Sequence, residues 1–161
     1  MMDFQPATYY LPHESPMVFL EKVCAVDNDS AICEVKISTE GILAPFLNER
    51  KALPAWFAIE IMAQAIGVWR GWHGIKKSET PRLGMLLGAR GLKSTLHEYP
   101  YNSILRVSVA LQLQDDKLAS FDCHLEIDGE QIIQARLNVY QPDELELARL
   151  IQPPTSEEPT A

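Results

Sequence analysis

Basic residues are scarce in this sequence, and their scarcity excludes one class of partner. The 161 residues contain 14 Lys and Arg against 22 Asp and Glu, which gives a formal net charge of −8. A general nucleic-acid-binding protein needs a basic face that neutralises phosphates. We therefore expect no nucleic-acid partner.

Cysteine is also rare, and its spacing forms no recognisable pair. Cys24, Cys33 and Cys123 make no CxxC motif, and all three fall in strand-like segments. An odd number of cysteines without a secretory leader favours reduced, buried thiols over disulfides. The same pattern argues against a metal site, so we expect free thiols and no metal.

The sequence has no apolar run that would span a bilayer comfortably. The stretch that begins at Leu53 is interrupted by Glu60, Gln64 and Arg70, whereas a membrane-spanning helix needs about 20 mostly apolar residues. The first residues, MMDFQPATYYLPHESP, do not combine a basic start with an apolar run, as a secretory signal does. These features predict a soluble, cytoplasmic protein with no membrane partner.

The chain has the length of one domain, followed by an acidic tail. We expect the folded body to cover residues 1–141 and the tail to cover residues 142–161. The tail sets five acidic residues against the single base Arg149: Asp143, Glu144, Glu146, Glu157 and Glu158. A short helical turn through DELELARLI is expected, and then disorder, because QPPTSEEPTA is rich in Pro, Ser and Glu.

The hydrophobic pattern of the body predicts strands on both sides of one helix. The runs MVFLEKVCAV and AICEVKIS flank the turn formers DNDS and predict a hairpin. Pro54 suits the first turn of a helix, which we expect to end near Gly71 in the sequence GWHG. Four later segments predict strands: GMLLGARGLKSTL, SILRVSVALQLQ, LASFDCHLEI and QIIQARLNVY. Alternation places Leu105 to Leu113 on one face of the second of these, and Asp128-Gly129 forms the turn between the last two.

The helix is apolar on nearly every side, and such a helix must be covered on every side. Its segment LPAWFAIEIMAQAIGVW, residues 53–69, has Glu60 as its only carboxylate. The inner face of one curved antiparallel sheet can cover most of it, and a partner subunit can cover the rest. We therefore predict an α+β protein with the hotdog fold, a curved antiparallel sheet around one long central helix, that is at least dimeric.

Three segments carry a family resemblance in the family's own order. They are LPHESPMVFLEKV, the helix LPAWFAIEIMAQAIG, and the strand region GARGLKSTLHEYPYNSILRV with its later hairpin DGEQIIQARLNV. Together they resemble the β-hydroxyacyl-acyl-carrier-protein dehydratases of bacterial fatty-acid synthesis over residues 11–141. Within that family, the variant helix is most similar to the dehydratase-like proteins of aryl-polyene pigment synthesis.

The resemblance implies loss of water from 3-hydroxyacyl thioesters carried on an acyl carrier protein, without cofactor or metal. This reaction needs a base for the α-proton and an acid for the departing hydroxide. Glu60 occupies the family's acid position, and its neighbours at helical spacing predict burial, which favours the protonated form of a carboxyl group. The backbone N–H groups after Pro54, near Ala55 and Trp56, would stabilise the thioester oxygen.

The family's histidine is missing from its usual loop. Its position falls near Phe46, and no histidine lies between Ala44 and Leu53. His13 is the best replacement, because the resemblance places its segment beside the substrate tunnel; local backbone bonding is an equally weighted alternative. The other histidines are less suited: His73 as a cap at the helix end, His97 in a loop and His124 on a polar strand face.

Two other interpretations stay open. The chain could be a non-catalytic or half-site subunit that provides Glu60 while a related hotdog chain provides the histidine, so the dimer could be a homodimer or a heterodimer. It could also hydrolyse acyl thioesters, although the helix motif disfavours this.

Further polar residues surround the expected site. Gln64 lies one turn after Glu60 and would either orient that carboxylate or satisfy nearby backbone. Acyl carrier proteins are acidic, so a local basic patch of Arg50, Lys51, Arg90 and Lys93 is the expected docking surface, against the alternative of scattered solubility charges.

Overall fold

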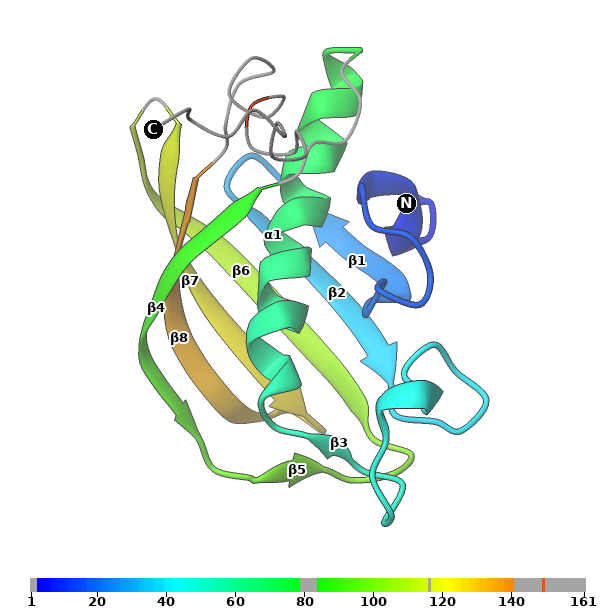
Figure 1. The fold of residues 1–161 in the computed structure, drawn as a ribbon. Coiled ribbons are helices and arrows are strands. Elements are labelled where there is room, and N and C mark those ends of the chain that lie inside the picture. The colour runs from blue at the N-terminus through cyan, green and yellow to red at the C-terminus, as the bar shows by residue number, and fades with distance from the viewer. Residues whose placement is uncertain (1–2, 79–83, 116, 141–148, 150–161) are drawn as a thin grey trace, which may run out of the picture.

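One long helix lies in the hollow of a curved antiparallel sheet (Figure 1). The computed structural model describes residues 3–78, 84–115, 117–140 and 149. The helix is α1 (Phe57–Lys76). The six strands of the sheet, in spatial order, are β1 (Lys22–Val26), β2 (Ser30–Lys36), β6 (Ile104–Asp115), β7 (Leu118–Ile127), β8 (Glu130–Tyr140) and β4 (Met85–Ser94). This arrangement confirms the predicted hotdog fold.

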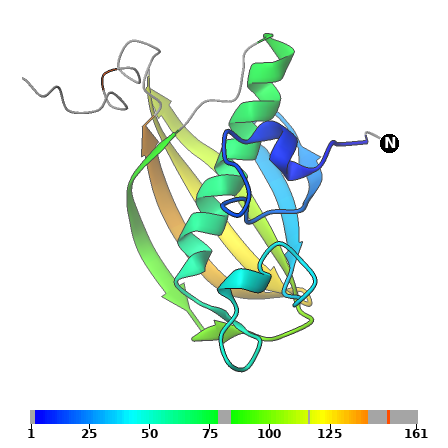
Figure 2. The ribbon, with the colours of Figure 1, turned by 45° about the vertical axis from the view of Figure 1, so that its right-hand side comes forward.

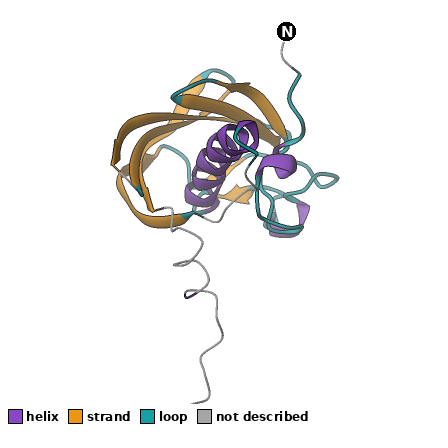
Figure 3. Cartoon of the chain, turned by 90° about the horizontal axis from the view of Figure 1, so that it is seen from above, coloured by secondary structure: helices purple, strands orange, loops and turns teal. Residues whose placement is uncertain are grey.

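Short elements complete the chain outside the sheet. They are η1 (Ala7–Tyr10), η2 (Ala44–Phe46), β3 (Leu53–Pro54) and β5 (Glu98–Tyr99), of which the last two pair with each other. The N-terminal segment crosses the upper part of α1 (Figure 2), and the view from above shows the sheet around the other sides of the helix (Figure 3). The curved sheet therefore surrounds part of the helix (Figure 3), and the N-terminal segment lies against another part (Figure 2).

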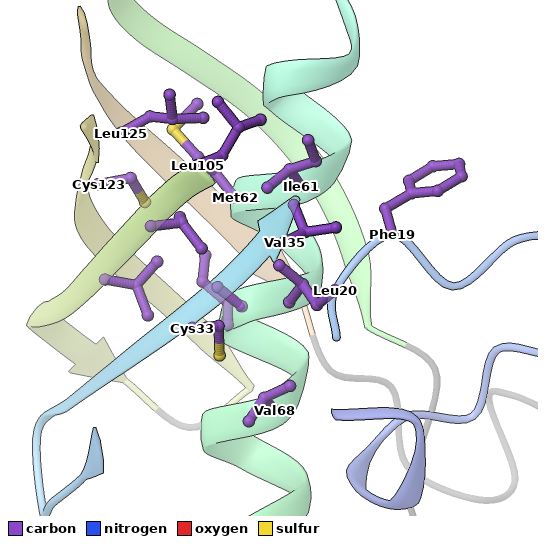
Figure 4. Close-up of a cluster of buried hydrophobic side chains, with 14 of the residues drawn as sticks. Phe19, Leu20, Cys33, Val35, Ile61, Met62, Val68, Leu105, Cys123 and Leu125 are labelled. Carbon is purple, nitrogen blue, oxygen red and sulfur yellow. The ribbon is translucent and has the colours of Figure 1, made fainter. Parts of the chain in front are cut away.

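Strand alternation produces the core as the sequence predicts. On β7 every second residue is buried, from Ala119 through Phe121 and Cys123 to Leu125, and β8 repeats the pattern. These side chains meet Ile61 and Met62 of α1, which are fully buried (Figure 4). The hydrophobic effect of this shared burial fixes the helix in the hollow of the sheet.

Several element boundaries differ from the prediction. Pro54 lies in β3, opposite Glu98, and the helix begins only at Phe57. The helix also continues past Gly71 to Lys76, because Gly71 serves a tertiary contact and is not a C-cap. On β6, Leu113 is 67% exposed, since the register with β7 shifts between Leu111 and Leu113 and turns the side chain off the inner face.

The turn prediction is confirmed, and the prediction of buried free thiols is confirmed for two of the three cysteines. Asp128 and Gly129 both have positive φ, 52° and 80°, as the predicted two-residue hairpin turn requires. All three cysteines are free thiols; Cys33 and Cys123 are buried, and Cys24 is half-buried. Burial raises the pKa of both Cys33 and Cys123 to about 12.

Two further expectations concern the surroundings of the fold. Within the described ranges, no helix is both long and apolar enough to cross a membrane. The predicted tail over residues 142–161, with its helical turn, lies outside the described residues apart from Arg149.

Candidate active site

His13 and Glu60 lie close together although they are far apart in sequence. The Nε2 atom of His13 is 3.9 Å from Oε1 of Glu60. This distance is too long for a hydrogen bond, so the imidazole and the carboxylate are two separate groups facing a common space. Both side chains are partly accessible, with 24% of His13 and 45% of Glu60 exposed.

The exposure of Glu60 corrects the prediction that its side chain is buried. The sheet covers the side of α1 that carries Ile61 and Met62, and leaves the stripe that carries Glu60 facing outward in the single chain. The apolar neighbours Trp56 and Phe57 do not shield it, since Trp56 is itself 74% exposed. Periodicity alone overestimated how completely one sheet surrounds the helix.

Gln64 is the one buried polar side chain among the described residues, at 1% exposure. Its Oε1 accepts a hydrogen bond of 2.8 Å from the backbone N–H of Phe19, and its Nε2 donates one of 2.7 Å to the carbonyl of Met17. The same Nε2 lies 3.4 Å from Oε1 of Glu60. The Gln64 amide therefore makes both kinds of contact expected of it: it forms hydrogen bonds with backbone groups, and it contacts the Glu60 carboxylate.

The two nitrogens of His13 differ in environment. Nδ1 is shielded from solvent and has no hydrogen-bond partner within the described part of the chain, whereas Nε2 faces Glu60. A proton exchanged between His13 and a bound molecule would therefore pass through Nε2. Among the described residues no backbone carbonyl accepts a hydrogen bond from Nδ1, so the contacts they make do not include the local backbone bond of the alternative interpretation.

A cavity of about 190 Å³ opens beside the pair. Its walls come from the N-terminal segment, from the outward stripe of α1 and from the ends of β4 and β8: Pro12, His13, Glu60, Ala63, Gln64, Ile66, Gly67, Arg70, Gly84, Leu86, Val139 and Tyr140. Most of this lining is apolar, and its polar side chains include the imidazole of His13 and the carboxylate of Glu60. Such a cavity suits a short apolar chain with one reactive polar end.

The N-terminus of α1 is less open than predicted. The N–H of Ala55 is already bonded to the carbonyl of His97 at 3.0 Å, because the β3–β5 pairing extends by one residue. Pro54 is buried in that pairing. Trp56 occupies the N-cap position without a side-chain cap. Trp56 is the exposed one of the three residues at the predicted thioester-oxygen site.

An aromatic cluster occupies the place of the family's histidine. Phe46 of η2 packs edge-on against Phe19 with ring centroids 5.1 Å apart, and it lies 5.3 Å from the ring of Phe57. The three rings that meet here, within the described part of the chain, carry no ionisable group. The imidazole nearest to Glu60 thus comes from the N-terminal segment.

The predicted basic residues have separate environments. The guanidinium of Arg50 makes two hydrogen bonds to Glu98 and holds the pKa of that carboxyl at about 2, while the ammonium of Lys51 lies over the ring of Tyr101. Arg90 and Lys93 are exposed on β4, opposite Arg136 and Gln134 of β8. Arg50 is therefore largely neutralised, and Arg90 and Lys93 are the better candidates for an acidic partner.

The remaining histidines have structural contacts. Nε2 of His73 lies 2.8 Å from the carbonyl of Asp27 in the β1–β2 turn, so His73 joins the helix to that turn and does not cap the helix. Nδ1 of His124 lies 2.8 Å from Oε1 of Gln131 on the outer face of the sheet. His97 is exposed, and its carbonyl accepts the bond from Ala55.

Two glycines of α1 contribute to the site in a way that the sequence pattern did not indicate. Gly67 lines the cavity, and both Gly67 and Gly71 contact the N-terminal segment closely. Their four-residue spacing inside an apolar helix was the available signal, but GWHG resembles a helix end.

The fold and this site define a hotdog-fold protein with an acid and an imidazole at one cavity. A family model described as ApeP-like, ApeP dehydratase, matches residues 5–152. The chain belongs to this family. It is 45% identical to a chain of the dehydratase heterocomplex ApeI:P from Xenorhabdus doucetiae, covering 94% of this chain and 100% of that one, with a TM-score of 0.87.

More distant structures share the fold. A hypothetical thioesterase with coenzyme A from Streptococcus pneumoniae is 12% identical over 74% of this chain and 86% of that chain, with a TM-score of 0.58. The TT0310 protein from Thermus thermophilus is also 12% identical, over 75% of this chain and 91% of its own, with a TM-score of 0.56. At this identity the likeness concerns the fold alone.

Proposed function

We propose that this protein acts in the dehydration of 3-hydroxyacyl thioesters on an acyl carrier protein, in the cytoplasm, during aryl-polyene synthesis. Membership of the ApeP dehydratase family supports the reaction class. The observation that carries the site assignment is the 3.9 Å approach of His13 to Glu60 at the mouth of an apolar cavity. The reaction removes the α-proton and protonates the departing hydroxide, and this pair provides one group for each transfer.

The chemistry divides between the two groups. Nε2 of His13 takes the α-proton, the C–O bond to the hydroxyl breaks, and Glu60 supplies the proton that converts the departing hydroxide to water. The electrons of the C–H bond form the new double bond, so the products are the enoyl thioester and one water. The N-terminus of α1 at Trp56 stabilises the negative charge on the thioester oxygen, and Gln64 keeps the carboxylate oriented.

A second candidate is the half-site role, in which a partner chain provides the base. Three features favour the half-site role: Phe46 occupies the histidine's place, the stripe of α1 with Glu60 faces away from the sheet, and β4 is an edge strand. Strand β4 is exposed along nearly its whole length, including Met85, Leu86, Leu87 and Leu92. An exposed apolar edge strand pairs readily with another sheet, and the similar structure from Xenorhabdus doucetiae is described as a heterocomplex.

A partner subunit that covered the stripe of α1 with Glu60 would also change the environment of the Glu60 carboxylate. Exclusion of water from the carboxylate favours the neutral acid that proton donation requires. We therefore propose a dimer with a second hotdog subunit, either another copy or a related chain, joined along β4. The acyl carrier protein would dock nearby through Arg90 and Lys93, which stay exposed in the single chain.

Mass spectrometry of a 3-hydroxyacyl carrier protein tests these proposals directly. The substrate is incubated with this protein alone, with a histidine-bearing hotdog partner alone, and with both. Loss of water with the protein alone supports the self-sufficient enzyme, whereas loss that rises only on mixing supports the half-site. Release of free acid in place of the enoyl product would overturn dehydration in favour of thioester hydrolysis.

A further inference from the structure

Four residues of α1 form one outward stripe that meets the N-terminal segment. Glu60, Gln64, Gly67 and Gly71 are spaced by four, three and four residues, which places them on one face of a helix. Along this stripe, Gly71 meets Tyr10, Gly67 meets Leu11 and Glu60 meets His13. Residues 10–13 of the segment and the stripe therefore run in opposite directions.

Gly71 is required by the close approach of the Tyr10 backbone. A Cβ atom at Gly71 would lie 2.9 Å from the carbonyl carbon of Tyr10 and closer still to its oxygen. The obstacle is backbone, which cannot rotate away as a side chain does. Glycine is a poor residue for a helix interior, so its presence here is explained by this contact.

Gly67 has a similar but softer contact. A Cβ atom there would lie 2.8 Å from Cδ2 of Leu11, the far end of a flexible side chain. Leu11 and Tyr10 are 5% and 6% exposed, so this part of the segment is packed firmly against the helix. The absence of side chains at the two glycines thus lets residues 10–11 pack directly against the backbone of α1.

The segment is fixed again further along by Gln64, which bonds the backbone of Met17 and Phe19. Between the two anchors, residues 14–16 are exposed, and the printed side-chain contact of His13 within the described residues is its approach to Glu60. The position of the imidazole therefore depends on where the anchors place the chain on either side of it.

We propose that Gly71, assisted by Gly67, is a positioning residue for His13. The missing side chain lets the carbonyl of Tyr10 sit directly on α1, and this sets Nε2 of His13 at its 3.9 Å distance from Glu60. The catalytic consequence rests on the proposed function, but the geometric consequence does not.

The test measures the His13–Glu60 proximity without substrate. The ring resonances of His13 in histidine-labelled full-length protein, assigned with His13→Gln, are compared at one fixed pH with and without Glu60→Gln. In the wild type, Glu60→Gln should shift them clearly. In Gly71→Ala this response should fall at least severalfold while circular dichroism shows a folded chain, and dehydration in the active assembly should fall at least tenfold.

Two further variants keep the proposal falsifiable if Gly71→Ala fails to fold. Gly67→Ala should weaken the same response, and adding Leu11→Val should restore it by removing the atom that the new Cβ meets. Gly41→Ala is the matched control, because a Cβ there has only ordinary contacts at 3.7 Å and beyond; its response should equal that of the wild type.

The results separate the two claims. A folded Gly71→Ala protein with an unchanged response would overturn the positioning role, as would a Gly67→Ala response that is unchanged or is not restored by Leu11→Val. If the response behaves as expected but neither the wild type nor its mixture with a partner dehydrates the substrate, the positioning role stands and the proposed function fails.

Discussion

Replacing Gln64 by leucine isolates the energetic value of its two backbone hydrogen bonds. The substitution keeps a side chain of similar size at a position that is 1% exposed, but it removes the acceptor of the Phe19 N–H and the donor to the Met17 carbonyl. Each of those backbone groups loses its partner while remaining in place. The loss therefore exceeds that of a hydrogen bond whose two members are removed together.

The two orphaned groups carry different costs. Phe19 is 2% exposed, so its N–H cannot reach water and its desolvation costs about 1–3 kcal/mol. Met17 is 50% exposed, so its carbonyl can be hydrated again and contributes only about 0.5–1 kcal/mol. The expected destabilisation is about 1.5–4 kcal/mol, which corresponds to a fall in Tm of roughly 3–16 °C for a domain of this size.

Thermal and urea unfolding of the isolated chain at one fixed protein concentration measure this loss. Gln114→Leu is the control, since Gln114 is exposed on β6 and its replacement should change the free energy of unfolding by less than about 0.5 kcal/mol. A Gln64→Leu loss below about 1 kcal/mol would refute the assignment of Gln64 as the downstream anchor of the N-terminal segment.

Three further outcomes are expected. Glu60→Gln should retain the thermal stability of the wild type and lose at least a hundredfold in dehydration rate; a folded variant of unchanged rate would remove Glu60 from the mechanism. His13→Ala should lower the rate by about a hundredfold; an unchanged rate in the mixture with a partner would assign the base to that partner. In the folded protein, Cys33 and Cys123 should resist alkylation at pH 8, because their pKa values of about 12 leave almost no thiolate. The stability that depends on these neutral thiols should be lost as pH rises from about 9 to 12. Mass spectrometry after iodoacetamide treatment counts the labelled thiols, and rapid labelling of both would contradict their burial.

Local pattern was sufficient where a residue's neighbours in sequence decide its environment. The alternation through β7 and β8 gave the inward residues from Ala119 to Leu125, and the Asp128-Gly129 pair gave its turn. Both features depend on the two-residue period of a strand or on the backbone freedom of a few residues. The order of these elements was then enough to predict the fold.

Local sequence pattern did not predict a residue's environment correctly where a distant segment of the chain determines that environment. Gly71 resembles a helix end until the carbonyl of Tyr10 is placed against it, and Leu113 resembles an inward residue until a register shift turns it outward. The exposure of Glu60 depends on how far the sheet reaches around the helix, which no window of residues contains. The 3.9 Å distance between His13 and Glu60 is likewise a property of the packed chain.

The packing of Phe46 has a consequence for how the family can evolve. Its ring packs against the rings of Phe19 and Phe57, so Phe46→His would place a polar ring against apolar ones and weaken their packing. The aromatic cluster therefore sets a packing cost on any second imidazole at this loop, because the ring that it would replace already holds η2 against Phe19 and the start of α1.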